Sequence, residues 1–198
     1  MKKQMQMIRN CGLVLVTASC LLTGCSNAGK AGIKAMENED YKEAVTQFTQ
    51  AAATAEAKGK KEAAAEAYRG LGMAYYELQE YDNVLESMQK ALDNGAQRTA
   101  ELYNIMGISA MQQEDYESAL SYFQEGVSYA ESTNAVNASK AKKDVDYSKL
   151  IQEMRYNQIV CYEKRQDWED AKAAANDYIA DYPDDADAEK EVEFLETR

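Results

Sequence analysis

Residues 102–126 read LYNIMGISAMQQEDYESALSYFQEG and contain two apolar stretches separated by the short polar segment QQED. In both stretches apolar residues recur at intervals of three and four, which is the spacing of one face of an α-helix. The polar segment between them is short and carries the signals of a turn. Residues 102–126 therefore predict two antiparallel helices that meet at a tight turn.

The same spacing occurs four times along the chain. In each copy an aromatic residue follows a heading position by nine residues, a small apolar residue follows it by twelve, and a third residue follows it by sixteen. The four sets are Gly32, Tyr41, Ala44 and Phe48; Gly72, Tyr81, Val84 and Met88; Gly107, Tyr116, Ala119 and Phe123; and Ile159, Trp168, Ala171 and Ala175. Because the offsets are constant within a copy while the distances between copies vary, the pattern indicates a repeated two-helix unit with unequal linkers.

This pattern resembles the tetratricopeptide repeat, whose units follow W-x₂-L-G-x₂-Y, then A-x₃-F and P. The resemblance is carried by Tyr68, Leu71, Gly72 and Tyr75 in the second copy, by Tyr103, Met106, Gly107, Ala119 and Phe123 in the third, and by Tyr162, Trp168, Ala171 and Pro183 in the fourth. The fourth copy has Ile159 in the place of the glycine, and the first has no tryptophan-like residue. Terminal units are expected to be atypical.

The resemblance implies an all-α fold, namely a right-handed α-solenoid of about four helix pairs with a C-terminal capping helix. We expect the repeat region to span residues 30–183, with pairs at about 28–58, 65–98, 100–133 and 150–183, and an acidic cap at 184–198. A single helix pair cannot bury its apolar face, so stacked neighbours supply the core. An ordinary helical bundle is the alternative architecture.

Three segments outside the constant spacing have their own predictions. Residues 52–62 lengthen either the helix or the loop between the first two copies. Residues 131–148 are polar and small at their start, which predicts a mobile loop followed by an extended helix start. After Pro183, we expect a short helix that covers the last apolar face through Val192, Phe194 and Leu195.

The N-terminus has the parts of a secretory signal peptide. Residues 1–10 carry Lys2, Lys3 and Arg9 without an acid, and the following Cys11–Thr23 is uncharged. This run is shorter than the roughly 20 apolar residues of a membrane-spanning helix, so a cleaved signal peptide at residues 1–24 is preferred over an uncleaved anchor.

The end of this run, Leu22-Thr23-Gly24-Cys25, resembles the lipobox of bacterial lipoproteins. That resemblance implies a diacylglyceryl group on the thiol of Cys25, cleavage just before it, and an acyl chain such as palmitate on the new amine. Residues 25–29 would then form a lipidated N-terminus and short tether. The implied location is the extracytoplasmic face of a bacterial membrane, and Ser26 implies the outer membrane if the cell is Gram-negative.

Charge and composition exclude several classes of function. The formal net charge of −12 becomes −15 once the three basic residues of the signal peptide are removed, and so acidic a chain lacks the basic footprint of a nucleic-acid-binding protein. The chain has no histidine, which removes Ser-His and Cys-His catalysis and the common zinc sites. We expect no enzyme, no catalytic residues, no cofactor and no metal. Cys161, the one cysteine left after processing and lipidation, is expected to be a buried small hydrophobe.

The repeat resemblance implies that the first helices of successive pairs line a concave groove for a protein or peptide partner. The residues placed there are Arg69, Met73, Tyr76, Asn104, Ile108, Met111 and Tyr156. The expected function is therefore a lipid-anchored scaffold for protein–protein interaction in the bacterial cell envelope. Alternatives are a subunit of an envelope assembly or secretion machine and, less favoured without histidine or an α/β pattern, a hydrolase or solute-binding lipoprotein. The partner's identity stays open.

Overall fold

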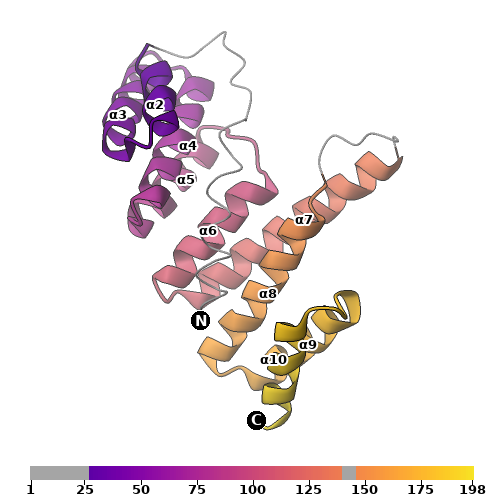
Figure 1. The fold of residues 1–198 in the computed structure, drawn as a ribbon. Coiled ribbons are helices and arrows are strands. Elements are labelled where there is room, and N and C mark those ends of the chain that lie inside the picture. Colours follow the sequence, from indigo (N-terminus) through magenta and orange to yellow (C-terminus); the bar gives the residue numbers. More distant parts are fainter. Residues whose placement is uncertain (1–26, 140–145) are drawn as a thin grey trace. The chain divides into compact units, whose positions relative to one another are not determined.

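The computed structural model describes residues 27–139 and 146–198, so residues 1–24, which we predict to be a signal peptide, and Cys25 lie outside the described residues. Within those two ranges all regular structure is α-helical, which confirms the all-α prediction. The chain forms two compact units, which divide between Gln97 and Arg98. Each unit is built from helix pairs whose members pack side by side (Figure 1).

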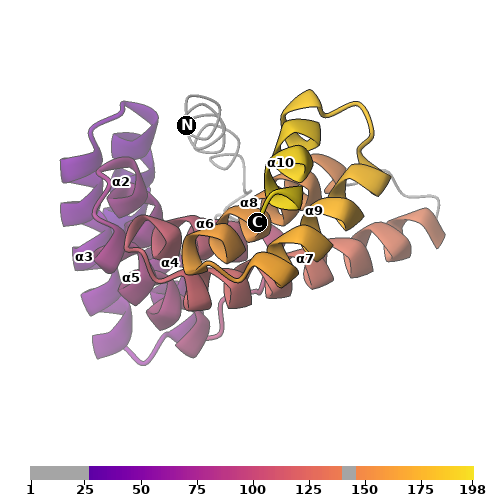
Figure 2. The ribbon, with the colours of Figure 1, turned by 90° about the horizontal axis from the view of Figure 1, so that it is seen from below.

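The first unit holds two helix pairs. Its helices are α2 (Asn27–Glu37), α3 (Tyr41–Ala57), α4 (Lys61–Glu77) and α5 (Tyr81–Asp93). The second unit holds two further pairs and a last helix that packs on α9 (Figure 2). Its helices are α6 (Ala100–Gln112), α7 (Tyr116–Ser139), α8 (Ser148–Arg165), α9 (Trp168–Asp181) and α10 (Ala186–Glu196). The aromatic residue at offset nine is the first residue of the second helix in all four pairs.

The turn inside each pair has the same conformation. The residue at offset seven is left-handed in every copy, with φ between 59° and 64° at Glu39, Gln79, Glu114 and Gln166. The next backbone N–H donates to a carbonyl oxygen five residues back, as when Asp115 N donates to Ala110 O over 3.0 Å. This is a Schellman-type helix end, which satisfies carbonyls that the helix leaves open. The polar turn segments of the sequence are therefore helix caps of one geometry.

The small heading residue makes room for the residue at offset sixteen. A Cβ added to Gly107 would lie 2.5 Å from the ring of Phe123, and one added to Gly32 would lie 2.8 Å from the ring of Phe48. At Gly72 the nearest atom would be the Cε of Met88, at 2.9 Å. Glycine is therefore needed in these copies because the partner helix brings a bulky side chain against the backbone.

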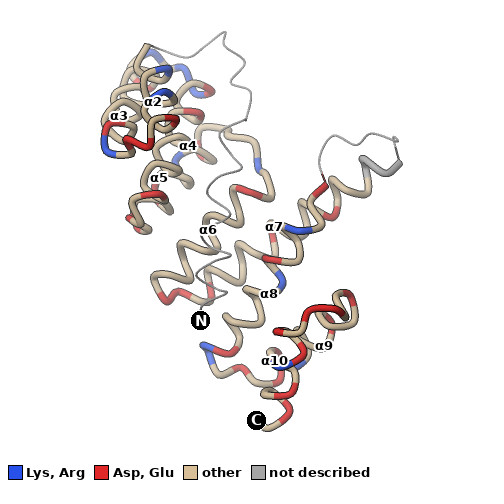
Figure 3. Tube along the Cα trace, in the orientation of Figure 1, with Lys and Arg blue, Asp and Glu red and all other residues tan. Residues whose placement is uncertain are grey.

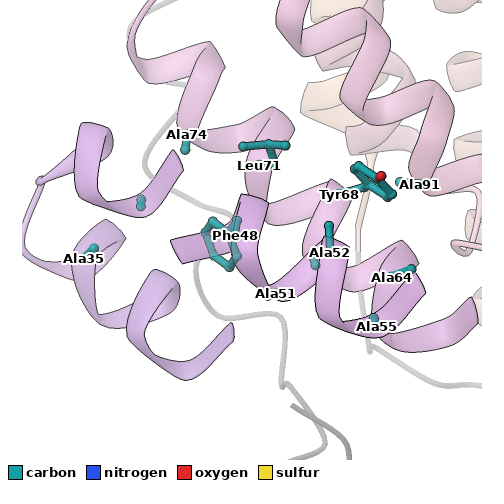
Figure 4. Close-up of a cluster of buried hydrophobic side chains, with 12 residues drawn as sticks. Ala35, Phe48, Ala51, Ala52, Ala55, Ala64, Tyr68, Leu71, Ala74 and Ala91 are labelled. Carbon is teal, nitrogen blue, oxygen red and sulfur yellow. The ribbon is translucent and has the colours of Figure 1, made fainter. Parts of the chain in front are cut away.

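The core of the first unit is centred on Phe48 of α3 (Figure 4). Its ring also lies against α4, where a Cβ on Gly70 would come within 2.6 Å of it. Two glycines on different helices thus allow one ring to join three helices. The surrounding side chains are mostly alanines, whose small size brings helix backbones close together. The buried cluster consists of Ala35, Ala44, Phe48, Ala51, Ala52, Ala55, Ala64, Ala67, Tyr68, Leu71, Ala74 and Ala91.

In the last helix pair the large and the small side chain of this contact have exchanged places. Ile159 stands at the glycine position and Ala175 at offset sixteen, and both are buried in one cluster. The large side chain now comes from the first helix and the small one from the second. The departure of the fourth copy from the repeat pattern is therefore compensated within the same pair.

The structure corrects two of the segment predictions. The predicted loop is wrong for residues 131–139, because α7 continues to Ser139, while residues 140–145 lie outside the described residues. The reason is tertiary: Glu131 pairs with Arg155 of α8, and the Asn134 side chain accepts the N–H of Tyr147 at 3.1 Å. Phe194 does not cover the apolar face as expected, since its side chain is 41% exposed, whereas Leu195 is buried.

The segment 52–62 lengthens helices rather than the loop. Helix α3 runs to Ala57 and α4 starts at Lys61, with Gly59 left-handed in the short turn between them. The added turns pack against each other, and the hydroxyl of Tyr68 donates to Glu56 Oε1 over 2.7 Å.

Candidate interaction face

In the first unit the predicted face lies on α4. Arg69, Met73 and Tyr76 are four and three residues apart, which places them on one side of the helix. Arg69 is partly exposed and its guanidinium pairs with Glu66 at 2.8 Å. Met73 is half-buried, and Tyr76 is buried with its ring edge-on to Tyr81, the centroids 6.3 Å apart. The accessible part of this face is therefore Arg69 and Met73.

In the second unit the predicted face begins on α6. Asn104 and Ile108 are buried, while Met111 is half-buried near the end of the helix. The side-chain amide of Asn104 donates to Glu153 Oε1 of α8 over 3.2 Å. This hydrogen bond joins the first helices of the two pairs, which the repeat resemblance places side by side.

Tyr156 of α8 is the last predicted residue of the face, and it is half-buried. Its ring is edge-on to Tyr178 of α9, with the centroids 5.7 Å apart. The Tyr178 hydroxyl in turn accepts from Gln152 at 3.0 Å and donates to Asp185 Oδ2 at 2.9 Å. These contacts fix the tyrosines of α8 and α9 beside the start of α10.

The surroundings of Tyr156 are acidic. Burial, and after it the charges of Glu191, Glu163, Asp185 and Asp187, together raise the pKa of its hydroxyl to about 12. Three of these carboxylates come from α10 or its cap, which is rich in Asp and Glu (Figure 3). The sequence analysis missed them as part of this face. Glu163 is detectable from the sequence because it follows Tyr156 by seven residues, which is two helical turns.

Arg155 is a second residue that the sequence analysis missed. Its guanidinium donates to Glu131 of α7 over 2.7 Å and also to Asp181 of α9. One side chain of α8 thus links the second helices of two successive pairs. Because the partners lie 24 and 26 residues away in the sequence, no local sequence pattern predicts the contact.

The one cysteine among the described residues lies inside α8. Cys161 is fully buried, as predicted, and burial raises the pKa of its thiol to about 12, so the reactive thiolate is scarce at neutral pH. In residues 27–139 and 146–198 no group of three or more His, Cys, Asp or Glu side chains is placed to hold a metal ion. No helix in the same ranges combines the length and apolar character needed to cross a bilayer.

Comparison with known families identifies the repeats. Two family models, both described as tetratricopeptide repeat, match residues 30–99 and residues 153–185. No curated protein sequence matches the chain.

Solved structures share the fold at low sequence identity. YrrB, a TPR protein with an unusual peptide-binding site, is similar with a TM-score of 0.62 and 19% identity, over 85% of this chain and 74% of YrrB. MamA AMB-1 is similar with a TM-score of 0.60 and 15% identity, over 85% and 78%. BtubC (BKLC) from P. vanneervenii has a TM-score of 0.58 and 14% identity, over 89% and 71%.

Proposed function

From the tetratricopeptide repeats that this chain contains, we propose that it is a scaffold that binds a protein or peptide partner and is held at a bacterial membrane by lipid on Cys25. The observation that carries the proposal is the repeated helix pair itself. Within each unit, stacked pairs form a framework whose first helices present side chains on neighbouring faces. The related fold of YrrB, which has a peptide-binding site, supports the same use here.

The proposed binding residues are the accessible ones on the first helices. These are Arg69 and Met73 on α4 in the first unit, and Met111 on α6 and Tyr156 on α8 in the second. Methionine adapts to irregular partner surfaces, and tyrosine and arginine are enriched among residues that dominate binding energy. Tyr76, Asn104 and Ile108 are buried and are not among the residues that we propose to vary.

The charge of the chain favours a basic partner. The net charge of −12 and the carboxylates around Tyr156 attract Lys- or Arg-rich segments and speed their association. Raising the ionic strength is then expected to slow association more than it speeds dissociation.

The lipid anchor is proposed from the sequence alone. The motif Leu22-Thr23-Gly24-Cys25 after a basic start and a short apolar run supports it. A diacylglyceryl group and an amide-linked acyl chain suffice for stable attachment, because each buried CH₂ contributes about 0.8 kcal/mol. The acidic polypeptide itself is repelled by an anionic bilayer surface. The implied site of action is the extracytoplasmic face.

The binding proposal is tested with a partner captured by crosslinking in intact membranes and then purified. Its affinity for the wild-type chain is compared with that for a variant carrying Met111→Ala and Tyr156→Ala. We expect the double substitution to weaken binding by about 2 kcal/mol or more. The control is Glu117→Ala, which changes an exposed residue on the second helix α7. If Glu117→Ala weakens binding and the double substitution does not, the partner uses the second-helix side and the proposal is wrong.

A further inference from the structure

The last repeat contains a carboxyl group in an unusual position. Glu163 of α8 is half-buried, and its Oε1 atom is fully buried with no hydrogen-bond donor among the described residues. The group that it meets within hydrogen-bond reach is the Glu191 carboxyl of α10. Two ionised carboxylates repel each other, whereas a single shared proton turns the same contact into a hydrogen bond.

No positive charge is well placed to replace that proton. In the described part of the chain, the charged groups that act on Glu163 are Glu191 from α10 and Lys164 from α8, and none from α7 or α9 does so. Lys164 acts only weakly, as the last of these influences. The Tyr156 hydroxyl also lies near Glu163 and stays uncharged around neutral pH, because its own pKa is about 12. The contact therefore depends on protonation.

Helix α10 closes the apolar side of the last pair. Ala188 and Leu195 of α10 are buried in the same cluster as Ile159, Ala171, Ala175 and Tyr178. Asp185 caps the start of α10 by accepting the N–H groups of Asp187 and Ala188. Helix α10 is short and buries only two side chains fully, so the free energy that keeps it docked is small. A repulsive contact at Glu191 would therefore offset a large fraction of that free energy.

We propose that α10 is a pH-sensitive cover, docked on the last helix pair while Glu163 and Glu191 share a proton and loosened when both carboxyls ionise. Loosening uncovers the apolar cluster of α8 and α9. The inference goes beyond the proposed scaffold function and does not depend on the identity of a partner.

The direction of the pH effect follows from the Glu163 carboxyl. Burial and contact with Glu191 raise its pKa from an ordinary value near 4.5 to about 8. A raised carboxyl pKa means that the docked state binds a proton more tightly than the open state, so docking is most favourable below about pH 4.5. The proton-linked contribution is lost progressively as the pH rises and is gone above about pH 8.

The test uses the single tryptophan of the chain as a local probe. Trp168 starts α9, and the guanidinium of Arg198, just beyond α10, lies 5.5 Å from its ring centroid. Trp168 fluorescence and hydrogen exchange of residues 186–196 are measured from pH 5 to pH 9, with exchange rates corrected for their intrinsic pH dependence. We expect the opening constant of α10 to rise by up to about tenfold per pH unit between pH 5 and pH 8.

Two amide substitutions separate the shared proton from ordinary packing. Glu163→Gln and Glu191→Gln each supply a permanent donor to the remaining carboxylate, so α10 is expected to stay docked with little change from pH 5 to pH 9. The control is Glu193→Gln, which alters an exposed residue of α10 and should retain the wild-type pH dependence. A wild-type α10 that does not loosen with rising pH, or a Glu163→Gln chain that loosens like the wild type, overturns the proposal.

Discussion

The most informative single residues are the paired positions at offsets zero and sixteen. Glycine faces phenylalanine or methionine in three copies, and Ile159 stands with Ala175 in the fourth. The sum of the two side-chain volumes matters more than the identity of either residue, since a helix pair tolerates only a fixed filling of the space between its backbones.

Exchanging the sizes in the third copy tests this directly. Gly107→Ala would place a Cβ 2.5 Å from the rigid ring of Phe123 and is expected to cost about 1–3 kcal/mol of unfolding free energy. Phe123→Ala alone leaves a cavity and should cost about 3–5 kcal/mol. The double variant Gly107→Ile with Phe123→Ala copies the fourth pair. Its loss of unfolding free energy should be smaller, by about 0.5–3 kcal/mol, than the sum of the losses in Gly107→Ile and Phe123→Ala alone. Urea unfolding of all variants provides the measurement.

The control is Gly72, which faces a flexible side chain instead of a rigid ring. Gly72→Ala meets the flexible end of Met88 at 2.9 Å, and alanine favours the helix more than glycine does, so its cost should be smaller than that of Gly107→Ala. Strictly additive effects at positions 107 and 123 would show that the two residues do not share one space.

The first helix of each pair ends in a turn of the same kind, whose left-handed residue is not glycine. Between successive pairs, the described left-handed residues are the glycines Gly59 and Gly95. A left-handed conformation costs an ordinary L-residue about 1–2 kcal/mol, part of which glycine avoids. The turns inside the pairs therefore hold a small reserve of strain.

Releasing this strain should stabilise the second pair. Gln79→Gly, at φ 61°, is expected to raise the unfolding free energy by about 0.5–1 kcal/mol after glycine's larger entropy loss is included. Gln113→Gly is a matched control, because Gln113 is also an exposed, neutral residue at a helix end but has φ −86°. It should lower stability, by up to about 1 kcal/mol. Thermal unfolding measures both effects. Midpoint temperatures that shift in the same direction for the two variants would contradict the proposed role of the left-handed turn.

At the scale of the whole molecule the decisive feature is the N-terminus, which lies outside the described residues. Cys25→Ser should leave an unprocessed precursor without lipid, because serine lacks the thiol that receives the diacylglyceryl group. Radiolabelled fatty acid and the mass of the protein in membrane fractions measure the outcome. Cys20→Ser, in the same apolar run, should be lipidated and cleaved normally. A lipidated mature protein from Cys25→Ser would refute the anchor.

The sequence by itself determined the register of the helix pairs. The constant offsets predicted a repeated two-helix unit. The residue at offset nine begins the second helix of every pair, and the residue at offset twelve is fully buried in all four, at Ala44, Val84, Ala119 and Ala171. This was predictable because a repeated unit imposes the same local steric requirements in every copy, so the pattern can be read from periodicity alone.

The tertiary structure alone decided which residues are accessible and which charges meet. Tyr76, Asn104 and Ile108 are buried, whereas the residues at the equivalent positions of another pair, Met111, Arg69 and Met73, are half-buried. Helix α7 extends to Ser139 because Glu131 and Asn134 find partners on or next to α8, and Glu163 meets Glu191 because α10 returns to the last pair. Contacts between residues far apart in the sequence leave no periodic trace, since they depend on the side from which the neighbouring helix arrives.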